Sequence, residues 1–138
     1  MDTLITALGE RIGIPGLRLD AQGCCRLLFD RAQLVELRHA PAQERWLLTC
    51  PLRGGAPDAH GLRLLMQGNL YGAGFGGGWA GLDTAGQVSL HLPVPQTQAS
   101  AAALLEAVEL LLSHAERWEA RLQGASVSAP VRDPSAWA

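Results

Sequence analysis

The 138-residue sequence predicts an α+β fold in which helices pack on one face of a single twisted antiparallel sheet. Two observations predict this class. Amphipathic helical patterns stand near both ends of the chain and in its middle, and short apolar or alternating runs between them have links too short for parallel crossovers. The predicted order is α-β-β-β-α-β-β-α, as one domain over residues 1–124 with a flexible tail over 125–138.

The first half of the chain predicts a helix and then a three-stranded meander. Residues 2–13 carry apolar side chains at helical spacing, and Gly13 with Pro15 ends that pattern. Three runs suited to strands follow at 24–29, 34–39 and 45–51. Because polar links of a few residues join them, antiparallel neighbours are the economical arrangement.

The second half predicts a helix, a hairpin and a longer helix. Asp58 is placed to cap a helix that continues to about Tyr71. Strands at 79–82 and 88–92 flank an Asp-x-x-Gly turn like the one at 20–23, and Pro93 and Pro95 are expected to end the sheet. The last helix begins between 97 and 100 and runs to about Gln123, where Gly124 closes it. Its apolar stripe has 4-3 spacing: Leu104, Val108, Leu111, Ala115, Trp118 and Leu122.

Composition excludes several classes of function. All eleven basic residues are arginine, so mechanisms that need a catalytic lysine are excluded. The arginines are dispersed rather than clustered, which disfavours nucleic-acid binding. No apolar run is long enough for a membrane span, and the N-terminus lacks the pattern of a signal peptide. We therefore expect a cytoplasmic protein with no membrane insertion.

Candidate chemical motifs are weak. The sequence Gly72-x-Gly74-x-x-Gly77 matches a dinucleotide fingerprint, but a helix precedes it and a strand follows it, the reverse of what phosphate binding needs. We interpret this stretch as a connector or a place where two backbones approach closely. The three cysteines and four histidines have no metal-ligand spacing. No cofactor, metal or catalytic residue is predicted.

Several passages resemble the type III secretion chaperones of the CesT/Tir-chaperone family, over residues 1 to about 123. The order of elements agrees, and the local signs are Leu8-Gly9-x-x-Ile12-Gly13-Ile14-Pro15 before Leu19-Asp20, the passage from Asn69-Leu70-Tyr71-Gly72 to Gly81-Leu82-Asp83, and Ala115-Glu116-Arg117-Trp118. The resemblance implies a bacterial cytosolic homodimer without enzymatic activity. Such a protein would hold the N-terminal chaperone-binding segment of a secreted effector in extended form and present it to the export apparatus.

The resemblance also implies two sets of binding residues. Apolar patches of the first helix and the sheet would bind the effector: Ile5, Leu8, Ile12, Leu27, Phe29, Val35, Leu37, Trp46 and Leu48. The second helix and the strand after it would form the dimer interface: Leu62, Leu65, Met66, Leu70, Trp79 and Leu82. The strand runs themselves support a partner, because they read as apolar on nearly both faces.

Two alternatives remain open at this stage. One is a dimeric protein-interaction module of similar fold that binds a regulator. The other is a small enzyme that uses Cys50 with a histidine.

Overall fold

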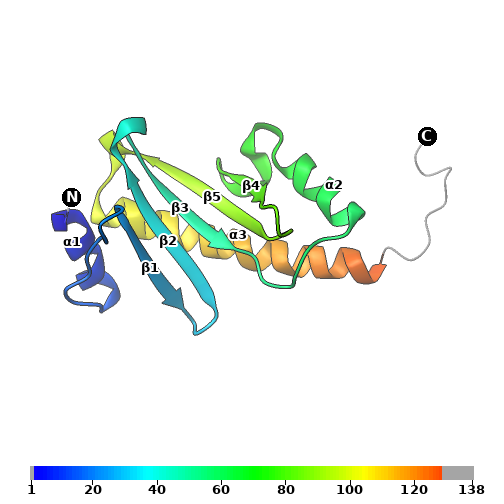
Figure 1. The fold of residues 1–138 in the computed structure, drawn as a ribbon, viewed down its shortest axis with the longest axis horizontal. Coiled ribbons are helices and arrows are strands. Elements are labelled where there is room, and N and C mark those ends of the chain that lie inside the picture. Colours follow the sequence, from blue (N-terminus) through cyan, green and yellow to red (C-terminus); the bar gives the residue numbers. More distant parts are fainter. Residues whose placement is uncertain (1, 129–138) are drawn as a thin grey trace.

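The structure is a computed structural model that describes residues 2–128, and it has the predicted order of elements (Figure 1). The helices and strands are α1 (Asp2–Ile12), β1 (Cys24–Phe29), β2 (Gln33–Ala40), β3 (Arg45–Pro51), α2 (Ala59–Gly68), β4 (Trp79–Leu82), β5 (Val88–Pro95) and α3 (Ala101–Ser128). Short 3-10 turns are η1 (Pro41–Gln43), η2 (Leu70–Phe75) and η3 (Gln96–Gln98). The α+β prediction is confirmed.

The five strands form one antiparallel sheet in the order β1-β2-β3-β5-β4. The long helix α3 runs along this sheet and packs against β3 and β5 (Figure 1). Both α1 and α2 pack against α3, towards opposite ends of the molecule. The helices therefore cover one face of the sheet, and the described chain places no helix on the other.

Burial alternates along every central strand, which fixes the face that each side chain occupies. Leu37 on β2 lies opposite Leu48 on β3, and Leu48 lies opposite Leu92 on β5, so these three leucines form one buried row under the helices. The other face has polar side chains at its centre and two leucines, Leu28 and Leu34, near the β1 edge. On this face Arg26 forms a salt bridge with Glu36 at 3.1 Å, and the Thr49 hydroxyl is hydrogen-bonded to the His91 ring at 2.9 Å. The expectation that the strands are apolar on nearly both faces is therefore wrong for the centre of the sheet, and it holds only at Leu28 and Leu34.

Two turns use the same aspartate chemistry, as the repeated Asp-x-x-Gly signature predicts. The Asp20 carboxylate accepts hydrogen bonds from the backbone N–H groups of Gln22 and Cys24, at 2.8 and 3.0 Å. These bonds lower the pKa of the Asp20 carboxyl. The Asp83 carboxylate accepts from Ala85 and Gln87 in the same way, both at 2.9 Å.

The glycine-rich stretch is a place of close backbone approach, which confirms one of its two interpretations. The Trp118 indole N–H donates to the Gly74 carbonyl at 2.9 Å, and its ring stacks on Phe75 with centroids 4.8 Å apart. A Cβ on Gly68 would stand 2.8 Å from Trp118. This packing ends α2 at Gly68 rather than near Tyr71, and the chain continues as η2.

The last helix differs from its prediction only at its end. All of its stripe from Leu104 to Trp118 is buried, and Leu122 is partly buried against the core. Gly124 does not adopt the left-handed conformation that would cap the helix, so α3 continues to Ser128. The predicted tail therefore lies mostly outside the described residues, and Trp137 with it.

We predict that Gly68→Ala lowers the free energy of unfolding by about 1–3 kcal/mol, because the new methyl group must displace the Trp118 ring. Chemical denaturation followed by tryptophan fluorescence measures this change. The control is Gly124→Ala, where a Cβ meets nothing within 4 Å and alanine favours the helix by up to about 1 kcal/mol. Equal stability of the two variants would contradict the role given to Trp118.

Candidate functional site

Seven of the nine residues expected to bind an effector lie in the hydrophobic core. Their side chains are at most 4% exposed: Ile5, Leu8, Leu27, Val35, Leu37, Trp46 and Leu48. The physical reason is that these residues lie on the sheet face that α1 and α3 cover, or on the covering side of α1 itself. The prediction that these residues anchor an effector at the surface is therefore corrected, because their side chains form the core of the monomer.

The other two predicted residues, Ile12 and Phe29, pack against the rim of the core and stay partly exposed. Beside them the structure adds two residues that the sequence analysis missed. Leu28 is 63% exposed and Leu34 is 38% exposed, and they lie directly opposite each other on β1 and β2. Their position two residues from Arg26 and Glu36 is the signal that could have placed them on the outer face.

Strand β1 forms one edge of the sheet and has free backbone groups. The Gly23 carbonyl accepts from the His39 N–H at 2.9 Å, so the odd-numbered residues of β1 face β2. The even-numbered residues face outwards. Both outward groups of Cys24 are already bonded to Asp20. The Asp20 backbone N–H donates to the Cys24 carbonyl at 2.7 Å, and the Asp20 carboxylate accepts from the Cys24 N–H at 3.0 Å. Arg26 and Leu28 are left with outward N–H and C=O groups that pair with no strand among residues 2–128.

The opposite edge strand is β4, and two prolines close to strand pairing the part of β5 that β4 leaves uncovered. Strand β4 pairs with β5 only as far as His91, although β5 continues to Pro95. The Val88 carbonyl accepts from Leu52, so even-numbered residues of β5 face β3 and odd-numbered residues face the β4 side. Beyond His91 these are Pro93 and Pro95, which have no N–H to donate. The prolines do not end the sheet, as the sequence suggested, but they protect its edge.

A second apolar surface lies over α2, η2 and β4, where the dimer interface was expected. Met66 is 74% exposed, Leu70 64% and Leu82 54%, and Leu62 is 39% exposed. Leu62, Met66 and Leu82 line one groove of about 330 Å³ together with Ala80 and Val88. Leu65 forms the buried floor of this groove at 5% exposure. Trp79 is half-buried and stacks on His91, with ring centroids 5.6 Å apart.

Tyr71 belongs to this second surface and was not predicted. Its side chain is 96% exposed, and its φ of +57° is left-handed, which is unfavourable for a residue with a bulky side chain. The start of η2 is fixed by Asn69, whose side-chain amide donates to and accepts from the backbone of Ala80 at 3.1 and 2.7 Å. The backbone therefore holds an aromatic ring out in solvent, beside Leu70.

The geometry does not assemble a cysteine enzyme. Burial raises the pKa of the Cys50 thiol to about 11, so the reactive thiolate is disfavoured near neutral pH. His91 is bonded to Thr49, whose side chain points to the opposite face of β3 from Cys50. No group of metal-ligating side chains occurs in the described part of the chain. None of its helices is long and apolar enough to cross a membrane.

The comparison with known protein families decides the class. The model of the Tir chaperone protein (CesT) family matches residues 3–119. The chain belongs to this family. Members of the CesT family are chaperones, which bind other polypeptides without catalysing a reaction, so the predicted family and the absence of an enzymatic role are confirmed.

Individual relatives of this CesT-family protein agree in sequence and in fold. The curated transcriptional anti-antiactivator ExsC of Pseudomonas aeruginosa PAO1 is 29% identical over 120 residues, covering 86% of this chain and 83% of ExsC. In the crystal structure of the ExsC–ExsE complex, the matched chain is 29% identical with a TM-score of 0.78, covering 88% of this chain and 92% of that one. The HopA1–SchA chaperone–effector complex matches at 24% identity and a TM-score of 0.75, covering 85% and 91%, which supports the fold alone.

Two neighbouring apolar residues of α2, Leu65 and Met66, are predicted to respond differently to a charge. Leu65→Asp places a carboxylate in the core and is expected to abolish the folded state, because burying an unpaired charge costs several kcal/mol. Met66→Asp is expected to keep the fold, since that side chain is exposed. Far-UV circular dichroism of the two variants distinguishes these outcomes, and an unfolded Met66→Asp would contradict the assignment of the surface.

Proposed function

We propose that this protein is a type III secretion chaperone that binds an unfolded segment of a secreted effector as an added strand on β1. The observation that carries the proposal is the open edge at Arg26 and Leu28, whereas at the opposite side of the sheet Pro93 and Pro95 block strand pairing along the part of β5 that β4 leaves uncovered. An extended polypeptide gains main-chain hydrogen bonds at such an edge, and its alternate side chains meet apolar neighbours on the two faces. By holding the segment extended, the protein keeps it competent for export.

The surroundings of this edge supply anchors on both sides of an added strand. Leu28 and Leu34 lie on the outer face of the sheet, and Ile12 and Phe29 lie at the rim of the helix-covered core. Apolar side chains at alternate positions of the effector would pack against one pair or the other. The Asp20 turn ends the available edge at Cys24, so the added strand is short and pairs at two positions of β1.

Similar proteins support the binding of a partner polypeptide. ExsC was crystallised in a complex with ExsE, and SchA, which shares the fold, was crystallised in a chaperone–effector complex with HopA1. We extend binding of a secreted partner to this chain. The proposal places the protein in the bacterial cytosol, where it would hand the bound segment to the export apparatus.

We also propose that two copies of this chain associate through the second apolar surface. This surface exposes four large apolar side chains, those of Met66, Leu70, Tyr71 and Leu82. Pairing the surface with its copy across a two-fold axis would remove these side chains from water. Sedimentation of the purified protein at micromolar concentration is expected to give twice the mass of 14.7 kDa, and the folded Met66→Asp variant is expected to give the single mass. A wild-type protein that sediments as a monomer would refute this interface.

A second candidate function is binding of a transcriptional regulator. The observation in its favour is the 29% identity with a relative that is named a transcriptional anti-antiactivator. In that case the same surfaces would bind a regulatory protein in place of, or in alternation with, a secreted one. Purification of the complex from the native bacterium, followed by mass spectrometry of the bound chain, distinguishes a secreted partner from a regulator.

The strand-addition proposal is tested by Leu28→Pro, which removes the outward N–H of Leu28 while proline remains tolerated on an edge strand. The control is Leu28→Ala, which removes the same side chain but keeps the N–H. With the co-purified partner, Leu28→Pro is expected to weaken binding about tenfold more than Leu28→Ala, in line with the loss of about one main-chain hydrogen bond. Equal affinity of the two variants, measured by calorimetry, would contradict strand addition at β1.

A further inference from the structure

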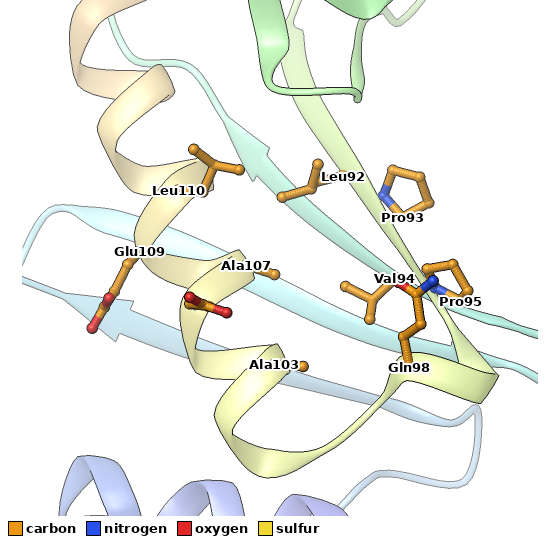
Figure 2. A pocket seen from close by; sticks show the side chains of 10 residues that line it. Leu92, Pro93, Val94, Pro95, Gln98, Ala103, Ala107, Glu109 and Leu110 are labelled. Atoms are coloured by element: carbon orange, nitrogen blue, oxygen red, sulfur yellow. The ribbon is translucent and has the colours of Figure 1, made fainter.

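A separate groove lies at the edge of the sheet opposite β1, between α3 and the end of β5 (Figure 2). It exists because β4 is half as long as β5, so that no strand among the described residues lies beside Leu92–Pro95. Its volume is about 620 Å³, within the range of binding sites for small ligands and side chains. Neither the open edge of β1 nor the groove of α2 and β4 shares a lining residue with it.

The floor of the groove is apolar. Leu92 and Val94 of β5 are each 7% exposed there, and Ala107 of α3 faces them at 8%. Figure 2 shows Leu92 and Leu110 approaching from opposite sides, with Leu110 itself 41% exposed. An apolar side chain that entered the groove would be removed from water on three sides.

The polar groups of the groove are almost all hydrogen-bond acceptors. Pro93 and Pro95 direct their carbonyl groups away from β3 and have no N–H. Glu106 lies one turn from Ala103 and Leu110 on the same face of α3, and its carboxylate makes no ion pair or hydrogen bond within residues 2–128. Glu109 adds a second carboxylate to the lining. Only the Gln98 side chain can donate. A complementary group must therefore supply donors, and a positive charge fits best beside Glu106.

We infer that this groove accepts an apolar side chain adjacent to an arginine or lysine of the bound partner chain. The inference rests on the proposed function, since it assigns a second contact point to the polypeptide that β1 binds. An arginine meets the requirements on both counts, because its aliphatic stem packs on the apolar floor while its five N–H donors meet the Pro93 and Pro95 carbonyls and the Glu106 carboxylate.

The test uses two synthetic peptides in place of the unidentified partner: acetyl-Leu-Ala-Arg-Leu-amide and the same peptide with glutamate instead of arginine. Each is titrated into the full-length protein at low salt, and the ¹⁵N amide shifts of Ala103, Ala107 and Leu110 report occupation of the groove. The arginine peptide is expected to bind about three- to tenfold more tightly than the glutamate peptide, the range for a partly exposed charge pair.

Three variants make the result specific. Glu106→Gln is expected to remove the preference, and Glu106→Arg is expected to reverse it in favour of the glutamate peptide. The control is Glu116→Gln, an exposed position about three turns further along the same helix that does not line the groove, and it is expected to keep the preference. Binding of both peptides with equal affinity, binding of neither, or a preference that survives in Glu106→Gln would each overturn the inference.

The co-purified partner separates this inference from the proposed function. If Leu28→Pro weakens the complex but Glu106→Arg does not, the groove assignment fails and strand addition at β1 stands. If Glu106→Arg weakens the complex and Leu28→Pro has no more effect than Leu28→Ala, the groove assignment stands and strand addition fails.

Discussion

The packing of α3 across β3 and β5 is the interaction on which the rest of the structure depends. Its buried stripe, from Leu104 to Trp118, meets the apolar rows of the sheet, and both shorter helices then pack against α3 itself. Trp118 extends this dependence to the glycine-rich segment through its bond to Gly74 and its contact with Gly68. The glycines at these points leave the space that the indole ring fills.

This single helix-covered face determines what is left for a partner. The apolar residues of the central strands are consumed in the core, and the outer face carries polar contacts such as Arg26 with Glu36 and Thr49 with His91. The apolar side chains that remain exposed therefore lie near the edges of the sheet. They are Leu28 on β1, Leu34 on β2 and the exposed residues of α2, η2 and β4. The two sheet edges then differ in their backbone groups, because β1 can both donate and accept while the prolines of β5 can only accept.

Sequence reasoning found the features that depend on local chemistry or on a long period. The capping of α2 by Asp58, the two aspartate turns and the stripe of α3 agree with the structure, since each is set by a few neighbouring residues or by many repeats. The resemblance to the chaperone family was also sound. The phase of β1 was missed because Leu27, Leu28 and Phe29 form a continuous apolar run, in which only the charged Arg26, two residues before Leu28, marks the outward positions.

The same limit explains why the candidate site was misplaced. Family resemblance pointed to the first helix and the sheet. Ile5, Leu8 and Ile12 share one face of α1, so their spacing could not separate the two fully buried residues from the partly exposed Ile12. The exposure of Tyr71 was not predicted, because it follows from a left-handed backbone conformation that hydrophobic periodicity does not indicate. Pro93 and Pro95 were read as the end of a strand, whereas their odd-numbered positions let β5 continue against β3.

The central claim is that a partner polypeptide extends the sheet at β1, and residue-resolved hydrogen exchange of the chaperone in complex with its co-purified partner tests it most directly. The account predicts that the amides of Arg26 and Leu28, which face solvent in the free protein, become protected together in the complex, as ladder hydrogen bonds form. Tight binding that leaves these two amides exchanging at their free rates would contradict it.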